Sequence, residues 1–168
     1  NINLILSKYI MKTVILAGGY GSRIPEYTDK IPKPMIKVGG VPLLTHIMRI
    51  FKSYGHNDFL IAAGYKKNII ENYYKNSSEF KNLKIIDTGK FTMTGGRILR
   101  MKKFLKKNEF FFMTYGDGLS NVNLDRLEKF HIKHKNLVSV TAVHPPVRFG
   151  ELKIKNNKII KFDEKPES

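Results

Sequence analysis

Cysteine is absent from this chain of 168 residues. Without it the protein can form neither a disulfide nor a thiolate metal site, which fits a reducing compartment and leads us to expect a cytoplasmic protein. No apolar run approaches the roughly 20 residues that cross a bilayer. Residues 1–10 also lack the basic start and the cleavage site of a secretory signal. We therefore expect no membrane partner.

Acidic residues are scarce as well: 14 Asp and Glu stand against 30 Lys and Arg, giving a formal net charge of +16. Such an excess raises nucleic acid as a partner. The lysines are scattered, however, and no arginine-rich arm or known nucleic-acid motif occurs. The four lysines within residues 102–107 lie on one side of an expected helix, and Ile98, Met101 and Leu105 lie on the other side. This arrangement is typical of a solvent-exposed helix face. We expect no specific nucleic-acid partner, although a basic field would attract anionic substrates.

Strand and helix patterns alternate along the chain, with short connections between them. Strand patterns occupy residues 12–17, 58–63, 83–88, 109–115 and 138–144. Helical patterns occupy residues 43–54, 66–75, 95–106 (with Thr94 at the N-cap) and 123–134. The stretch 109–115 is almost wholly apolar, the mark of a strand buried on both faces. The alternation predicts an α/β protein with a doubly wound, mostly parallel, Rossmann-like sheet.

Residues 150–155 and 158–162, joined at Asn156-Asn157, predict a terminal β-hairpin. No repeat or linker divides the chain, so we expect a single domain over 11–168, with 1–10 as an extension without function. Because the sequence stops directly after a strand with no closing helix, we expect this domain to be incomplete at its C-terminus.

A glycine-rich loop follows the first expected strand, and residues 15–23 read Ile-Leu-Ala-Gly-Gly-Tyr-Gly-Ser-Arg. Glycines let backbone N–H groups close around phosphate oxygens, and Arg23 can fork onto a phosphate. A Walker A loop would end in Gly-Lys-Ser/Thr, and a dinucleotide loop would need glycine where Ile24 stands, so neither class fits. The loop predicts a binding site for a triphosphate.

Lys33 stands ten residues further on, between Pro32 and Pro34. Proline fixes its own φ, and Pro34 biases Lys33 toward an extended conformation. We therefore expect the backbone that carries Lys33 to be rigid, and the Lys33 ammonium to add a second positive charge to the phosphate site.

Two further stretches are candidates for ligand binding. Asp117 follows the expected strand 109–115, at the edge where open α/β sheets bind ligands, and its carboxylate suits Mg²⁺ held together with phosphates. In isolation an Asp-Gly pair more often caps a turn. The second stretch, 92–97, opens a helix with two glycines, and Arg97 could donate to a base carbonyl. On its own this stretch is more often a flexible helix start.

Several motifs together resemble the sugar-phosphate nucleotidyltransferases, and within that family the glucose-1-phosphate cytidylyltransferases. The glycine-rich loop and Pro32-Lys-Pro are shared by the wider family. The resemblance covers more than nine-tenths of the chain, from residue 11 onward, and rests further on stretches that follow in this order: Asp87-Thr-Gly, Thr92-Met-Thr-Gly-Gly-Arg97, Thr114-Tyr-Gly-Asp-Gly118, Pro145-Pro-x-Arg-Phe-Gly150 and Glu164-Lys-Pro166.

The resemblance implies transfer of a cytidylyl group from CTP to a sugar 1-phosphate, α-D-glucose 1-phosphate above all, giving a CDP-sugar and pyrophosphate. It implies Arg23, Lys33 and Asp117 as catalytic residues, with Mg²⁺ on Asp117. It implies Thr92 and Arg97 as contacts of the cytosine and Lys165 as a contact of the sugar phosphate. The nucleotide would be held by Leu16, Ala17, Gly18, Gly19, Tyr20, Gly21, Ser22, Arg23 and Lys33.

Two departures from that family bear on function. The segment between Tyr74 and Ile86 is shorter than the insertion typical of the cytidylyl branch. The family's second acidic metal ligand and much of its sugar pocket lie in a C-terminal part that this sequence lacks, so the chain alone is expected to be inactive or impaired. Two alternatives stay open: UTP, dTTP or GTP as the nucleotide, and a nucleotide-binding module without turnover. The oligomeric state is also open, with a homo-oligomer as one option.

Overall fold

The computed structural model describes residues 11–143 and 151–163, and the chain divides into two compact units, of which the first ends at Asp125. The first unit contains a sheet of four parallel strands in the order β5-β4-β1-β6. These strands are β1 (Lys12–Ala17), β4 (Asp58–Ala63), β5 (Asn82–Asp87) and β6 (Phe111–Tyr115). The predicted parallel sheet is confirmed.

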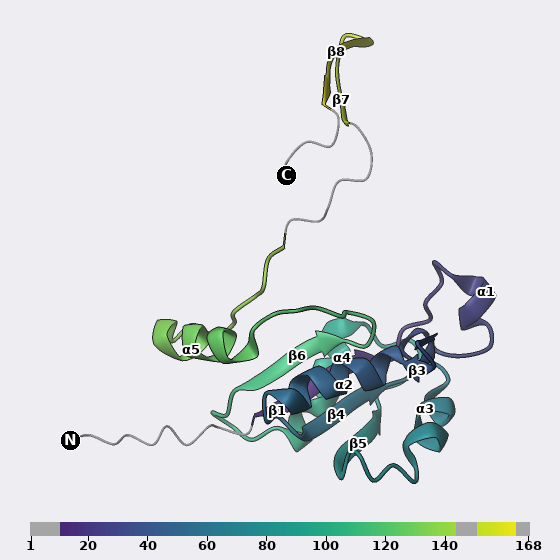
Figure 1. Ribbon diagram of the computed structural model, residues 1–168, viewed down its shortest axis with the longest axis vertical. Coiled ribbons are helices and arrows are strands. Elements are labelled where there is room, and N and C mark those ends of the chain that lie inside the picture. The colour runs from purple at the N-terminus through teal and green to yellow at the C-terminus, as the bar shows by residue number, and fades with distance from the viewer. Residues whose placement is uncertain (1–10, 144–150, 164–168) are drawn as a thin grey trace. The chain divides into compact units, whose positions relative to one another are not determined.

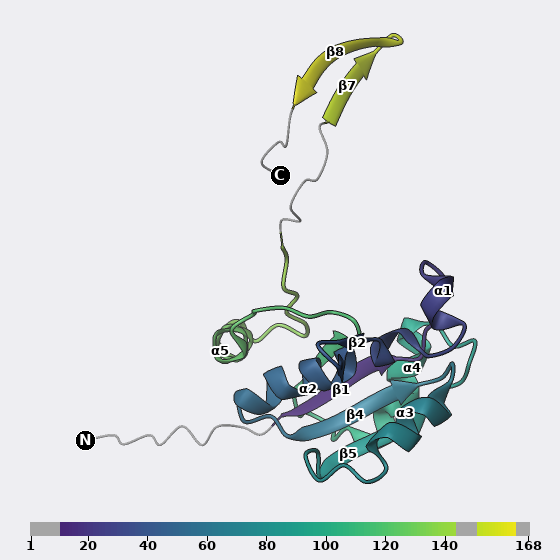
Figure 2. The same cartoon turned by 45° about the vertical axis from the view of Figure 1, so that its right-hand side comes forward.

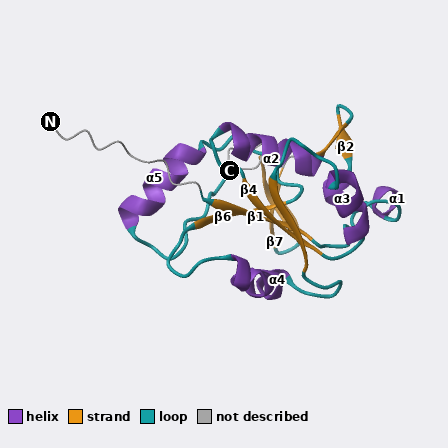
Figure 3. Cartoon of the chain, turned by 90° about the horizontal axis from the view of Figure 1, so that it is seen from below, coloured by secondary structure: helices purple, strands orange, loops and turns teal. Residues whose placement is uncertain are grey.

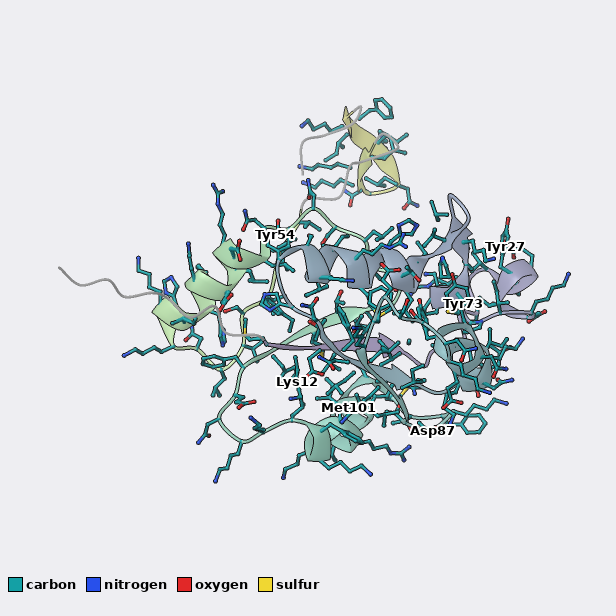
Figure 4. All side chains as sticks on the ribbon, turned by 60° about the horizontal axis from the view of Figure 1, so that its bottom comes forward. Lys12, Tyr27, Tyr54, Tyr73, Asp87 and Met101 are labelled. Atoms are coloured by element: carbon teal, nitrogen blue, oxygen red, sulfur yellow. The ribbon has the colours of Figure 1, made fainter. Side chains whose placement is uncertain are left out.

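The pairing of the strands brings their carboxyl ends to one edge of the sheet. In β1, Lys12 lies opposite Asp58 and Phe111, while Leu16 lies opposite Ala62 and Tyr115. In Figure 4, Lys12 marks the amino end of the sheet and Asp87 marks the carboxyl end. Loops that follow different strands therefore meet at one edge, where a ligand site can be assembled from distant parts of the sequence.

Helices cover both faces of the sheet, as a doubly wound fold requires. Helices α2 (Leu43–Ser53) and α3 (Lys67–Tyr74) lie on one face and α4 (Thr94–Met101) lies on the other (Figure 3). On the α4 face Met101 packs into a buried cluster, whose other members are Val14, Leu16, Leu60 and Ala62. On the α2 face the ring of Phe51 contacts that of Phe112 edge-on, with centroids 5.5 Å apart. The core is thus a sandwich of helix, sheet and helix (Figure 1).

Helix α4 is shorter than the sequence predicts. It ends at Met101 and tightens into a 3-10 turn, η2 (Lys102–Phe104), instead of continuing to residue 106. Thr94 is the first residue of the helix, and Met93, which precedes it, forms no side-chain cap. A 3-10 turn at a helix end satisfies carbonyl groups that have no partner further along the helix.

Strand β6 is not buried on both faces, so this expectation is wrong. It forms an edge of the described sheet, and Phe111, Met113 and Tyr115 are 37%, 45% and 53% exposed. Its apolar composition predicted the strand itself but not its position, because strand order depends on pairing between distant segments. Helix α4 leaves β6 uncovered, since Met101 packs against β1 and β4.

The expected strand 138–144 is also wrong over its described part. Residues 138–143 carry no strand pairing, and His144 lies outside the described residues. The sequence analysis missed two short elements, helix α1 (Pro25–Thr28) and the two-stranded ladder of β2 (Lys37–Val38) and β3 (Val41–Pro42). Figure 2 shows α1 beyond the carboxyl ends of the strands.

The second compact unit begins at Arg126, within helix α5 (Leu124–His134), and holds the predicted hairpin of β7 (Glu151–Lys155) and β8 (Lys158–Asp163). Asn156 and Asn157 join the strands with φ values of 47° and 60°, the left-handed pair that a tight hairpin turn requires. Among the helices described, none has the length and apolarity needed to cross a membrane. The extent of the domain over 11–168 stays a prediction.

The core contains one buried hydroxyl that has no hydrogen-bond partner among the described residues, that of Thr13 in β1. A buried polar group without a partner costs about 1–3 kcal/mol. Thr13→Val keeps the shape and removes the hydroxyl. We therefore expect urea unfolding to show a free energy of unfolding that rises by about 1 kcal/mol.

Thr45→Val is the matched control, because the Thr45 hydroxyl is buried but shares a hydrogen bond of 2.6 Å with the hydroxyl of Tyr74. Burial raises the pKa of Tyr74, and the variant would leave its buried hydroxyl without this partner. The control should lower the free energy of unfolding by about 1–2 kcal/mol. A loss of stability in both variants would contradict this account of Thr13.

Candidate active site

A pocket of about 560 Å³ opens at the carboxyl edge of the sheet, within the first unit. Its walls come from the loop after β1, the Pro-Lys-Pro segment, the loop between β5 and α4, and the end of β6. Every predicted site residue within the described ranges lines it, namely Leu16, Ala17, Gly18, Gly19, Tyr20, Gly21, Ser22, Arg23, Lys33, Thr92, Arg97 and Asp117. Lys165 lies outside the described residues. The structure thus brings these side chains together, while their individual roles stay predictions.

Helix α1 supports the glycine-rich loop through Thr28. The Thr28 hydroxyl is buried and lies 3.1 Å from the carbonyl oxygens of both Gly21 and Ile24. Gly21 has a φ of 68°, and a Cβ there would come within 2.6 Å of the Thr28 methyl group. Position 21 therefore requires glycine both for its backbone conformation and for space. Thr28 was missed because nothing in the sequence marks a lone threonine as a loop support.

The connection after β4 holds the same loop from a second side. The Tyr65 hydroxyl donates to the carbonyl oxygen of Thr28 at 3.1 Å, and the Tyr65 amide donates to that of Gly18 at 3.2 Å. Lys66 donates to the carbonyl oxygens of Thr28 and Asp29. With both its start and its end bonded to other elements, the loop keeps its shape while Gly19 and Arg23 remain exposed.

Lys33 begins a 3-10 turn, η1 (Lys33–Met35), so the extended conformation expected for it is wrong. Pro34 stands at the second position of this turn, where a proline has no hydrogen bond to lose and its fixed φ suits a helix. Pro32 and Pro34 are nevertheless buried. Lys33 therefore projects from an anchored backbone, and its ammonium forms an ion pair with the carboxylate of Asp117.

Asp117 is held close to this turn by Gly116. A Cβ at position 116 would come within 2.7 Å of the Pro34 ring, and the Gly116 amide donates to the carbonyl oxygen of Leu16 at 2.9 Å. The Pro-Lys-Pro segment and the end of β6 are consequently in direct contact. The sequence placed both at one edge, but the contact that pairs Lys33 with Asp117 depends on tertiary packing.

The fit of a metal ion depends on Asp117. Among the residues that the structure describes, no group of three or more His, Cys, Asp or Glu side chains could hold a metal ion. The pocket lining includes one carboxylate, that of Asp117. Mg²⁺ commonly takes one or two protein carboxylates and completes its shell with substrate phosphates and water. The pocket therefore suits Mg²⁺ that arrives with phosphates, and the expectation of Mg²⁺ on Asp117 stays a prediction.

Arg97 lies under the pocket with its side chain almost fully buried, only 6% of the residue being exposed. One terminal nitrogen, Nη2, donates to the carbonyl oxygen of Gly18 at 2.8 Å. The other, Nη1, donates to the carbonyl oxygen of Gly89 at 2.8 Å and to the Thr88 hydroxyl at 2.7 Å, and lies 3.3 Å from the carbonyl oxygen of Ala63. Burial lowers the pKa of Arg97, with the nearby Arg100 as a second cause.

The Arg97 guanidinium therefore joins the chain segments that follow β1, β4 and β5. Arg100 adds bonds to the carbonyl oxygen of Thr88 at 2.6 Å and to the Thr92 hydroxyl at 2.7 Å. Both residues that the resemblance assigns to the cytosine, Thr92 and Arg97, are thus bonded within the protein in this structure. Their contact with a base stays a prediction.

A parallel α/β sheet with a glycine-rich anion loop and a facing lysine–aspartate pair at its carboxyl edge is typical of proteins that bind nucleotides. Residues 12–168 match the family model described as nucleotidyl transferase, and the chain belongs to this family. The protein is a nucleotidyltransferase, as the sequence analysis expected.

Its curated relatives include a glucose-1-phosphate cytidylyltransferase of Salmonella typhimurium, 38% identical over 93% of this chain and 69% of that protein. A probable glucose-1-phosphate cytidylyltransferase of Bacillus subtilis is 37% identical over 94% of this chain and 70% of that protein. The predicted resemblance to these enzymes is confirmed.

Among solved structures, HddC from Yersinia pseudotuberculosis complexed with GMP-PN superimposes with a TM-score of 0.68, covering 92% of this chain and 69% of that one at 24% identity. A UDP-glucose pyrophosphorylase complexed with UDP-glucose gives a TM-score of 0.64 at 21% identity, over 94% of this chain and 70% of that one. At these identities the comparison establishes a shared fold, which is the Rossmann-like fold predicted from the sequence.

The packing around Arg97 makes a prediction for two adjacent glycines. A Cβ at Gly18 would lie 2.1 Å from Nη1 of Arg97, whereas a Cβ at Gly19 meets no atom within 4 Å. Gly18→Ala must therefore displace the guanidinium and break its bonds to the carbonyl oxygens of Gly18 and Gly89 and to the Thr88 hydroxyl. We expect Gly18→Ala to lower the free energy of unfolding by about 2–4 kcal/mol in urea titrations.

Gly19→Ala is the matched control and should change the free energy of unfolding by no more than about 1 kcal/mol, the usual difference between glycine and alanine. Equal losses of stability in the two variants would show that the hydrogen bonds of Arg97 do not stabilise the carboxyl edge of the sheet.

Proposed function

We propose that this nucleotidyltransferase transfers a cytidylyl group from CTP to a sugar 1-phosphate, α-D-glucose 1-phosphate in the first instance, releasing pyrophosphate. The observation that carries the proposal is the single pocket that the glycine-rich loop, Lys33 and Asp117 line together. The choice of CTP and glucose 1-phosphate is supported by the names of relatives 37–38% identical to the chain.

The reaction is an in-line displacement at the α-phosphorus of the nucleotide. An oxygen of the sugar phosphate forms a new bond to this phosphorus, while the bond from the phosphorus to the oxygen that bridges it to the β-phosphate breaks. Pyrophosphate carries away the electron pair of the broken bond. No covalent intermediate with the protein is needed, so the protein contributes by positioning the reactants and neutralising charge.

In this proposal the loop amides and Arg23 bind the β- and γ-phosphates, which become the leaving group. Lys33 stabilises the negative charge that grows on the α-phosphoryl group. Asp117 would hold Mg²⁺, which when bound neutralises phosphate charge. Lys33 and Asp117 form an ion pair in this structure, and the proposed binding of phosphate by Lys33 and of Mg²⁺ by Asp117 would separate them. Both side chains are about one-third exposed, so this separation costs little.

The base is assigned to the side of the pocket formed by the start of α4, with Thr92 and Arg97 as its proposed contacts. Lys165 is proposed to contact the sugar phosphate, by resemblance alone. UTP, dTTP and GTP remain the alternatives to CTP within the same reaction, because base choice depends on a few contacts only.

Pyrophosphate release tests the proposed reaction. The intact polypeptide that carries these residues is assayed with Mg²⁺ and glucose 1-phosphate, and with CTP, UTP, dTTP, ATP and GTP in turn. We expect release with CTP, and at a much higher rate than with the other four. Faster release with another nucleotide would overturn the assignment of the base, and no release with any would overturn the choice of acceptor.

Lys33 gives a prediction for the chemical step. Lys33→Ala removes a charge directed at the α-phosphoryl group, so we expect the rate of pyrophosphate release to fall by about 10²–10³-fold. The circular dichroism spectrum and the urea midpoint should stay unchanged, because the ion pair of Lys33 is partly exposed.

Lys37→Ala is the control, because Lys37 is exposed in β2 and outside the lining of the pocket. It removes the same charge four residues away and should leave the rate within about twofold, since the charge lies beyond close contact with the phosphates. Full activity of Lys33→Ala would refute the role assigned to Lys33.

A further inference from the structure

An aromatic wall lines one side of the pocket, formed by Tyr20 and Phe91 with the Lys90 ammonium over both rings. The ring centroids of Tyr20 and Phe91 lie 6.1 Å apart, and their planes are inclined by 42°. The Lys90 ammonium lies 5.7 Å from the Tyr20 centroid and 5.6 Å from that of Phe91. The two rings come from loops after different strands, β1 and β5, so only the folded sheet brings them together.

The wall is exposed although it is apolar. Phe91 is 83% exposed, the neighbouring Met93 is 81% exposed, and Tyr20 is 38% exposed. Met93 also lines the pocket. Large apolar side chains that gather at a pocket while uncovered mark a surface that a ligand can cover. Isolated exposed residues would carry no such meaning, but these three share one pocket.

Both loops that carry the rings are held in place. Behind Tyr20 lies Tyr65, with ring centroids 4.9 Å apart, and Tyr65 is anchored by its hydroxyl to the Thr28 carbonyl. On the other loop, Arg100 bonds to Thr88 and Thr92, on either side of the Phe91 segment. A wall whose supports are fixed loses little conformational entropy when a flat ligand covers it.

We propose that the base of the bound nucleotide stacks on the aromatic wall of Tyr20 and Phe91. This inference rests on the proposed function, which places the phosphates on the glycine-rich loop that Tyr20 itself belongs to. Every base presents a π face, so stacking adds affinity for all nucleotides alike and leaves base selection to hydrogen bonds at the base edge. The wall is thus a general nucleoside contact, distinct from the cytosine contacts proposed for Thr92 and Arg97.

The absence of tryptophan from the chain allows a direct optical test. Phe91→Trp places a single indole in the wall, and stacking of a base on it quenches its fluorescence. We expect CTP and UTP to quench this emission to a similar extent at saturation. Inorganic triphosphate, which has no base, and glucose 1-phosphate should leave it nearly unchanged.

Phe110→Trp is the matched control, since Phe110 is half exposed and stands at the opposite, amino end of β6. Its emission should not respond to any of the four ligands. If glucose 1-phosphate rather than CTP quenches Trp fluorescence in Phe91→Trp, the wall binds the sugar and the proposal is wrong.

Affinity gives the second measurement, by calorimetric titration of the unaltered chain and of Phe91→Ala. We expect the variant to bind CTP and UTP about 5- to 150-fold more weakly, with the ratio of the two affinities unchanged. Its affinity for inorganic triphosphate should stay the same. Unchanged CTP affinity would overturn the stacking and leave the proposed function intact, whereas an unaltered chain that binds no nucleotide would overturn both.

Discussion

The buried guanidinium of Arg97 is the interaction on which the site depends. The carboxyl ends of parallel strands leave carbonyl groups that the ladder no longer satisfies, and burying them without donors is costly. Arg97 adds donors at Gly18, at Ala63 in the last position of β4, and at Gly89. The carbonyl oxygen of Gly18 also accepts from the Tyr65 amide, and that of Ala63 from the Thr88 amide and hydroxyl. With those carbonyls turned toward Arg97 and the loop held from beneath by Thr28, the conformation of the loop is fixed before any ligand arrives. A preformed anion loop loses less conformational freedom on binding than a flexible one.

The ion pair of Lys33 and Asp117 can be exchanged for bonds to a bound ligand and its metal ion. Lys33 and Asp117 form an ion pair across a contact set by the packing of Pro34 on Gly116. A triphosphate accompanied by Mg²⁺ would give each of them a new partner of opposite charge. Such an exchange leaves neither charged group buried without a partner of opposite charge. It also links the proposed binding of the phosphates to that of the metal.

Local pattern predicted the elements well, whereas their mutual arrangement lay beyond it. β1 and β4 match their predicted bounds because runs of apolar residues between turn signals are local properties. The burial of β6 and the strand expected at 138–144 failed because each depends on which distant segment becomes a neighbour. The β2–β3 ladder was missed although Gly39-Gly40, with φ values of 58° and 79°, is a recognisable hairpin signal. For the site, motif spacing placed the loop, Lys33 and Asp117 at one edge, but the carbonyl partners of Arg97 follow from tertiary packing alone.

The most direct test of the account is a crystal structure of the chain with CTP and Mg²⁺. We expect the β- and γ-phosphates to lie against the amides of the glycine-rich loop, with Lys33 and Asp117 separated and bonded to ligand and metal. The bonds of Arg97 to Gly18 and Gly89 should persist, because they support the loop in both states. CTP bound elsewhere, or bound at the loop with the Lys33–Asp117 pair still intact, would contradict the account.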